Sequence, residues 1–245
     1  MSFAFIFPGQ GSQALGMADQ LLADYPTARI RFEQASDILG YDIEKLIAEG
    51  PAEKLNSTEV TQPALMVVSV AAWDQWRAEG GPLPKFMAGH SFGEYSALVC
   101  SGAMSYEDGI AIVQYRGRFM QEAAPADGGA VAAILGLEPQ PLIEICENSA
   151  GDEIVQCANF NAPGQIAIAG HSGAVARAGE AAKEAGAKKV IPLKVSAPVH
   201  TEIMRPAADR LAEKLAAIHI GTPEVAVLHN VDVQTRQDAD GIRQA

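Results

Sequence analysis

The chain has 245 residues, 48% of them hydrophobic and 20% charged, and 18 Lys and Arg against 30 Asp and Glu give a formal net charge of −12 at pH 7. This composition excludes a mainly disordered chain, and the acidic balance argues against nucleic acid as a partner, since a phosphate backbone requires a basic face. The longest apolar run, residues 64–73, is about half of what a membrane-spanning helix needs, so we expect a soluble protein with no membrane partner.

The cysteines and the N-terminus indicate the cellular compartment. Cys100, Cys146 and Cys157 are odd in number and contain no C-x-x-C pair, which argues against a disulfide framework and against a zinc site. Buried thiols in a reducing compartment are the simplest interpretation. Residues 1–8 lack the basic segment and the cleavage site of a secretory signal. We therefore expect a cytoplasmic protein without a metal centre.

The first half of the chain alternates strand-like apolar runs with helical spacing, which predicts an α/β fold with a largely parallel sheet. In chain order the predicted elements are a strand at 3–7, helical spacing over 17–35 and 38–48, a long apolar helix at 61–77, a strand at 85–88 and a helix at 94–102.

The pattern changes between residues 128 and 195. Its predicted elements are a strand at 131–137, a helix at 141–150, strands at 154–159 and 165–169, a helix at 173–186 and a strand at 188–195. This βαββαβ order is the ferredoxin-like pattern. It predicts a small domain, residues 128–195, inserted into a larger α/β domain made of residues 1–127 and 196–245. The larger domain then resumes with helical spacing at 200–217 and a strand at 225–229, and the polar residues 234–245 could begin a helix.

The sharpest chemical signal is Gly89-His-Ser-Phe-Gly93, a G-x-S-x-G motif between a predicted strand and a predicted helix. The flanking glycines let the backbone turn tightly, so that the Ser91 hydroxyl projects from the sheet edge beside the N–H groups of the helix start. A chance Gly/Ser turn is the alternative. We interpret Ser91 as a nucleophile.

A serine nucleophile needs a base within hydrogen-bond reach. The candidate histidines are His90, His171, His200, His219 and His229. His200 ranks first because Ser196-Ala-Pro-Val-His200 is a loop placed where the chain re-enters the large domain. The other four are better explained by packing, capping or a surface position.

Arg116, in Gln114-Tyr-Arg-Gly-Arg118, has two possible interpretations. It could hold a substrate carboxylate through two parallel hydrogen bonds. From the residues alone, an exposed arginine on a helix is the simpler reading.

Three separated motifs together resemble one family. Phe7-Pro-Gly-Gln-Gly-Ser-Gln13, Gly89-His-Ser-Phe-Gly-Glu-Tyr-Ser-Ala97 and Tyr115-Arg-Gly-Arg-Phe-Met120 are similar to motifs of the malonyl-CoA:acyl carrier protein transacylases of bacterial fatty acid synthesis. The segments 61–65, 159–165 and 195–200 extend the resemblance over the whole chain. It implies a hydrolase-like α/β domain with a ferredoxin-like subdomain.

The resemblance also implies roles for individual residues. Ser91 corresponds to the serine that accepts the acyl group and His200 to its general base. The backbone N–H groups of Gln10 and Phe92 correspond to the oxyanion hole. Arg116 would hold the malonyl carboxylate, and Gln62 would line the pocket. Malonyl-CoA is then the substrate, acyl carrier protein the partner, and no cofactor is bound.

Acyl carrier proteins are acidic, so a basic patch is expected where they dock. Residues 177–194 carry five basic and two acidic side chains, and we nominate Lys188 and Lys189 within them. A solvated helix face is the simpler reading of this stretch.

The chain differs from the family in one respect, and two alternative functions are also possible. Members of the family continue for several dozen residues beyond the position of Ala245, including a segment whose backbone carbonyl orients the base, so we expect either a fragment or an incomplete sheet and cleft. One rival is an α/β serine hydrolase or thioesterase, suggested by G-x-S-x-G alone. The other is a non-catalytic acyltransferase-like module that docks carrier proteins.

Overall fold

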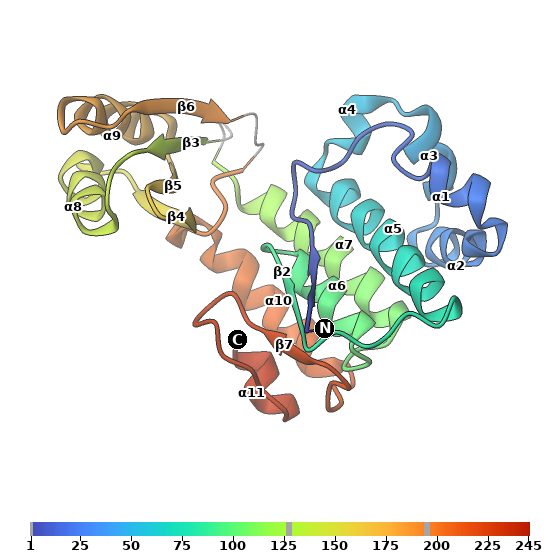
Figure 1. The fold of residues 1–245 in the computed structure, drawn as a ribbon. Coiled ribbons are helices and arrows are strands. Elements are labelled where there is room, and N and C mark those ends of the chain that lie inside the picture. Colours follow the sequence, from blue (N-terminus) through green and yellow to red (C-terminus); the bar gives the residue numbers. More distant parts are fainter. Residues whose placement is uncertain (1, 126–128, 194–196) are drawn as a thin grey trace. The chain divides into compact units, whose positions relative to one another are not determined.

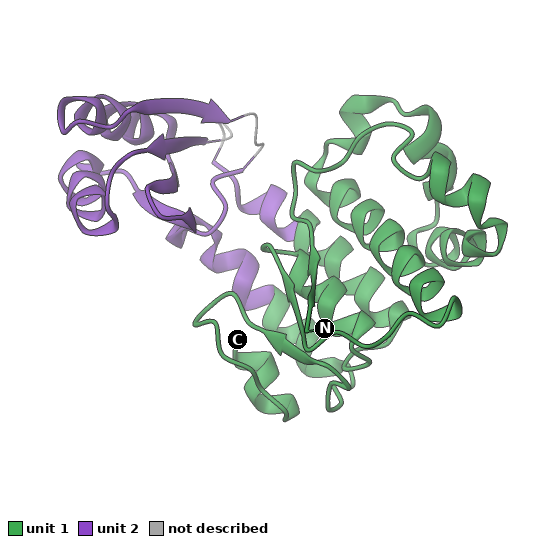
Figure 2. Cartoon of the chain, in the orientation of Figure 1, with its two compact units in different colours: residues 1–118, 211–245 green, residues 119–210 purple. Residues whose placement is uncertain are grey.

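The structure is a computed structural model that describes residues 2–125, 129–193 and 197–245 (Figure 1). It divides into two compact units, residues 1–118 with 211–245 and residues 119–210 (Figure 2). The predicted domain boundaries, at 127/128 and 195/196, lie outside the described residues and remain predictions. The α/β class itself is confirmed, because both units combine helices with a sheet.

The first unit contains a parallel sheet of three strands. They are β1 (Ala4–Phe7), β2 (Phe86–Gly89) and β7 (Ala226–Leu228), in the order β1-β2-β7. Phe7 pairs with Gly89, and Ala88 pairs with Leu228. The carboxyl ends of all three strands therefore meet at one edge, where ligands of open parallel sheets bind.

Helices surround this sheet. They are α1 (Asp19–Asp24), α2 (Arg29–Leu39), α3 (Ile43–Glu49), α4 (Ala52–Leu55), α5 (Thr58–Ala78), α6 (Gly93–Cys100), α7 (Tyr106–Ala123), α10 (Arg205–Ala217) and α11 (Ala239–Gln244), with α7 and α10 contributing residues to both units. Buried apolar side chains from α2, α3, α5 and α6 and from strands β2 and β7 form one core. None of the described helices combines the length and the apolar character needed to cross a bilayer.

Two predicted helices differ from the structure, one in its middle and one at its start. The helical spacing over 17–35 is interrupted at Pro26, where a 3-10 turn (Pro26–Ala28) separates α1 from α2. Proline lacks an N–H and disfavours the helical conformation in the residue before it, and Tyr25 accordingly has φ −131° and ψ 76°. The predicted helix at 200–217 likewise begins only at Arg205, after a 3-10 turn at Glu202–Met204.

The second unit contains an antiparallel sheet of four strands with two helices. The elements are β3 (Ala130–Leu135), α8 (Pro139–Ala150), β4 (Val155–Ala162), β5 (Gln165–Gly170), α9 (Ser172–Glu184) and β6 (Lys189–Leu193). The strand order is β4-β5-β3-β6. The two helices and the sheet enclose a separate apolar core that includes Ile134, Leu142 and Ile168. The predicted βαββαβ pattern is confirmed.

Candidate active site

The candidate site lies at the carboxyl edge of the parallel sheet in the first unit. The loop after β1 carries Gln10, the turn after β2 carries Ser91, and the loop after β7 carries His229 and Asn230. Residues distant in the sequence meet here because parallel strands end at the same edge.

Ser91 occupies the tight turn that the motif predicted. Its φ is 54°, a left-handed conformation that is uncommon for residues other than glycine. A Cβ on Gly89 would overlap the backbone of Gly93, and a Cβ on Gly93 would lie 2.6 Å from the Phe7 carbonyl oxygen. Both glycines are therefore required for the strand, the turn and the start of α6 to pack this closely.

The backbone N–H groups of Phe92 and Gln10, which the resemblance assigns to the oxyanion hole, lie at the start of α6 and in the loop after β1. Phe92 is the N-cap of α6, and Gln10 follows β1, whose end packs against the α6 start through Gly93. Within the described residues, neither the Phe92 nor the Gln10 backbone N–H has a hydrogen-bond partner. The Gln10 side chain donates to the Thr58 hydroxyl at 3.2 Å, which fixes this loop against α5.

Arg116, on α7, is partly buried and reaches Ser91. Its Nη2 donates to the Ser91 Oγ at 3.2 Å, and its Nη1 donates to Gln62 Oε1 at 2.9 Å. Gln62 is fully buried on α5. Gly117 makes the approach possible, because a Cβ there would lie 2.5 Å from the Thr58 carbonyl oxygen on α5. Arg116 is thus directed into the site rather than into solvent.

Burial lowers the pKa of the Arg116 guanidinium, while Tyr95 and Glu94 oppose that shift. The guanidinium lies 5.8 Å from the centre of the Tyr95 ring. Burial likewise raises the pKa of the Tyr95 phenol. An arginine remains charged at any physiological pH, so the site presents a partly desolvated cation beside the Ser91 hydroxyl.

His200 lies in the second unit. It is exposed, and its φ of 59° is again left-handed. Its loop is held by a hydrogen bond from the Thr201 hydroxyl to the Pro198 carbonyl at 2.7 Å. The two units are described separately, so the pairing of His200 with Ser91 remains a prediction.

A buried carboxylate that the sequence analysis did not single out links the start of α6 to the loop after β7. Glu94, in the first turn of α6, accepts from His229 Nδ1 at 2.6 Å and from the Asn230 backbone N–H at 2.7 Å. It also accepts from the Asn230 side-chain amide. The Asn230 Oδ1 in turn accepts from the backbone N–H of Ser91 at 3.2 Å.

Two other histidines have positions that fit structural roles. His171 Nδ1 accepts the Ile154 N–H at 3.0 Å and closes the end of β5. His229 is fully buried, and within the described residues its Nε2 has no hydrogen-bond partner. Among the described residues there is also no cluster of three or more side chains suited to a metal ion.

Comparison with known proteins decides the family. The acyl transferase domain family matches residues 4–242. The malonyl CoA-acyl carrier protein transacylase of Salmonella typhimurium is 52% identical over 243 residues, which cover 99% of this chain and 79% of that protein. The chain belongs to this transacylase family.

Solved structures of the family have the same fold. The transacylase of Coxiella burnetii superposes with a TM-score of 0.97 at 50% identity, covering 100% of this chain and 77% of that one. A malonyl-transacylase in complex with its type II polyketide synthase acyl-carrier protein superposes with a TM-score of 0.98 at 49% identity. The match covers 100% of this chain and 79% of that one. The predicted combination of a parallel sheet with a small antiparallel one is therefore that of the transacylase family.

In this member of the transacylase family, Glu94 and Asn230 are the site residues that sequence analysis missed. Glu94 directly follows the G-x-S-x-G motif, and Asn230 follows a predicted strand. Sheet topology could have identified them, because residues that follow neighbouring parallel strands lie at the same edge of the sheet. The strand ending at residue 229 was predicted, but its neighbour in the sheet was not.

Proposed function

We propose that the chain transfers malonyl from CoA to the phosphopantetheine thiol of acyl carrier protein, with a malonyl ester on Ser91 as the intermediate. The observation that carries the proposal is the hydrogen bond of 3.2 Å between Arg116 Nη2 and Ser91 Oγ. This bond supports the proposal because a cation lies beside the Ser91 hydroxyl, and both residues belong to the same unit.

The position of Arg116 also supports a short dicarboxylic acyl group. In a malonyl ester on Ser91, the free carboxylate is separated from the ester carbonyl carbon by two C–C bonds of about 1.5 Å each. Such a carboxylate remains close to Oγ and can replace Ser91 and Gln62 as the acceptor of the two guanidinium hydrogen bonds. An acetyl group would leave the partly buried cation without that partner.

The proposed transfer proceeds in two half-reactions. His200 accepts the proton of Ser91 Oγ as the oxygen attacks the thioester carbonyl, and the Gln10 and Phe92 N–H groups stabilise the oxyanion. The C–S bond then breaks, and the CoA sulfur takes the proton from His200. In the second half, the pantetheine thiol gives its proton to His200 and attacks the ester, so that Ser91 Oγ leaves and recovers a proton.

The left-handed backbone of both residues supports this assignment of roles. Ser91 and His200 have φ values of 54° and 59°. A non-glycine residue in this region costs about 1–3 kcal/mol, and such residues cluster at functional sites. The strain at these two positions, in two units, is consistent with a nucleophile and its base.

Trapping the acyl-enzyme tests the proposal. Mixed with malonyl-CoA alone, the protein is expected to gain the mass of one malonyl group on the peptide that contains Ser91, with one equivalent of CoA released. Addition of holo acyl carrier protein should then discharge the adduct onto the carrier. Continued release of CoA without a carrier would identify a thioesterase instead, and absence of an adduct would identify a non-catalytic docking module.

We further propose that Lys188 and Lys189 contribute to docking of the acidic carrier. Both are exposed, and among the described residues neither has an ion-pair partner. The neighbouring Arg177 and Lys183 are instead paired, with Glu153 and Glu180. Lys188 and Lys189 are therefore available to a partner's carboxylates.

Reversal of these two charges tests the docking surface. Lys188→Glu with Lys189→Glu is expected to raise the KM for the carrier by about 3- to 10-fold and to weaken its salt dependence, since rim charges act mainly on association. Acylation by malonyl-CoA should be unchanged. The control is Lys45→Glu with Lys54→Glu in the first unit, which alters net charge equally. An unaltered carrier KM in the first variant, or the same rise in both, would remove these lysines from the surface.

The same proposal places the enzyme in the cytoplasm. Cys100, Cys146 and Cys157 are all free thiols in the structure. Free cysteines are typical of a reducing compartment.

A further inference from the structure

The conformation of Ser91 depends on groups outside the turn itself. Within the turn, the His90 carbonyl accepts from the Gly93 N–H at 3.0 Å and the Ser91 carbonyl accepts from the Glu94 N–H at 3.1 Å. These bonds fix the carbonyl sides of the two peptides. The N–H of Ser91 is held from the loop after β7, by the Asn230 side chain.

The orientation of the Asn230 amide is determined by its two neighbours. Its Nδ2 donates to the Glu94 carboxylate, and its Oδ1 accepts from the Ser91 N–H. A rotated amide would set its oxygen against the carboxylate and its NH2 against an N–H, and both contacts would be repulsive. A carboxylate at position 94 thus selects the one amide orientation that can accept from Ser91.

Glu94 is itself held firmly. It is 9% exposed and accepts three hydrogen bonds, two from Asn230 and one from the fully buried His229. Its place in the first turn of α6 favours a negative charge through the helix dipole. His229 Nε2 has no hydrogen-bond partner among the described residues, so the ring joins this cluster only through Nδ1 and its bond to Glu94.

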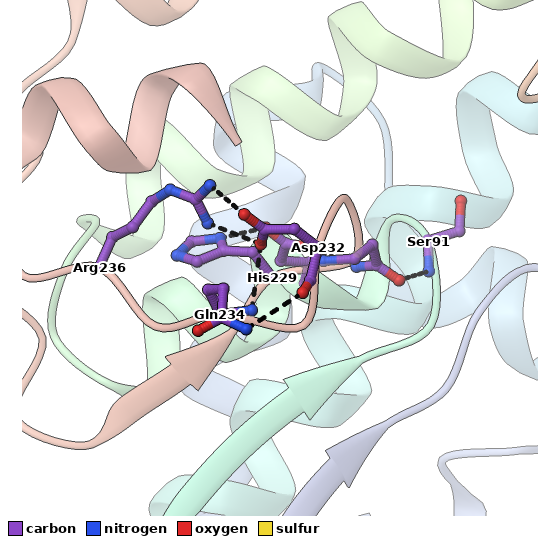
Figure 3. Close-up of polar contacts among 7 residues, drawn as sticks. Ser91, His229, Asp232, Gln234 and Arg236 are labelled. Atoms are coloured by element: carbon purple, nitrogen blue, oxygen red, sulfur yellow. Dashed lines mark hydrogen bonds and ion pairs between the residues drawn. The ribbon is translucent and has the colours of Figure 1, made fainter.

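The loop that carries Asn230 is braced as well. The His229 N–H donates to the Gln234 carbonyl, and the Val233 N–H donates to the His229 carbonyl. The Asp232 carboxylate accepts from Arg236 at 2.7 Å and from the Gln234 N–H at 3.0 Å, and these bonds lower the pKa of Asp232 (Figure 3). The loop therefore presents Asn230 in a fixed place although Asn230 lies at the surface.

We infer that Glu94 and Asn230 are positioning residues for the nucleophile: the buried Glu94 carboxylate orients the Asn230 amide, and the amide holds the Ser91 N–H so that Oγ faces the substrate. The inference rests on the proposed function, because the consequence of the arrangement is the rate at which Ser91 is acylated. Neither side chain transfers a proton or bonds to the acyl group.

The first test compares Asn230→Ala with the wild-type chain in single-turnover acylation by malonyl-CoA. The acylation rate constant is expected to fall by about 10-fold, the scale of one lost hydrogen bond at a fixed group, while the KM for malonyl-CoA stays within about 2-fold of the wild-type value. Val231→Ala is the matched control, since Val231 is 64% exposed on the same loop. It should acylate at the wild-type rate.

A second test uses the complementarity of the two side chains. Asn230→Asp sets a second carboxylate against Glu94 and should acylate more slowly than Asn230→Ala at pH 8. Its rate should rise as the pH falls, because one proton shared by the two carboxylates restores a hydrogen bond between them. Glu94→Gln combined with Asn230→Asp removes one of the two facing carboxylates and so relieves their repulsion. This double variant should recover part of the rate that Asn230→Asp loses.

The outcomes separate this inference from the proposed function. If the wild-type chain forms no adduct, the proposed function fails. If the wild type is acylated and Asn230→Ala is acylated equally fast, or if the loss appears only in KM, the positioning role is overturned. An Asn230→Asp variant that the Glu94→Gln exchange does not improve at all, at unchanged melting temperature, likewise contradicts it.

Discussion

Replacement of Ser91 by alanine is expected to lower malonyl transfer by about 10⁴-fold or more, because loss of the nucleophile removes the covalent route altogether. The substitution removes only Oγ, which accepts a hydrogen bond from Arg116, and it should leave the fold intact. The measurement is the rate of malonyl transfer to holo acyl carrier protein, with intact mass as a second readout. No adduct should form.

A double variant tests whether His200 acts on Ser91. His200→Ala alone is expected to slow acylation by about 10²–10⁴-fold, the contribution typical of a general base. In the Ser91→Ala background, however, the same substitution should cost almost nothing further, since a base without its nucleophile has no proton to accept. Independent, multiplicative losses would show that His200 acts elsewhere than on Ser91.

The elements that local patterns determine were predictable from the sequence. Short apolar runs and helical spacing in the sequence predict the βαββαβ order of the second unit. Every one of its elements lies within a few residues of its predicted position. The turn at Ser91 was predictable for the same reason, because glycines on both sides of one serine leave few conformations.

Contacts between distant segments were not predictable in this way. The Glu94 and Asn230 positions are 136 residues apart, and their contact follows from the pairing of β2 with β7. His229 follows an apolar strand, so its sequence context indicated only packing and not a carboxylate partner. Arg116 was ambiguous until α7 was placed against α5, a contact made by Gly117. Such residues become interpretable only when strand order and helix packing are known.

Arg116→Ala is expected to change which acyl group is accepted. The kcat/KM for malonyl-CoA should fall by about 10²-fold, equivalent to about 3 kcal/mol for a charged pair that loses one partner. Transfer of acetyl should be spared or should rise. Arg116 donates to Ser91 Oγ and to Gln62, so its removal takes one hydrogen bond from the Ser91 hydroxyl and leaves no unpaired cation beside a neutral acyl group.

The matched control for that prediction is Arg118→Ala, two residues further along α7, where the arginine is exposed. It removes the same charge from the same helix, and the ratio of malonyl to acetyl transfer should remain that of the wild-type chain. Arg116→Lys should fall between wild type and Arg116→Ala, because an ammonium keeps the charge but cannot make two parallel hydrogen bonds to a carboxylate. Equal losses for malonyl and acetyl in Arg116→Ala would mean that the guanidinium orients Ser91 alone, and the choice of a dicarboxylic acyl group would then depend on other residues.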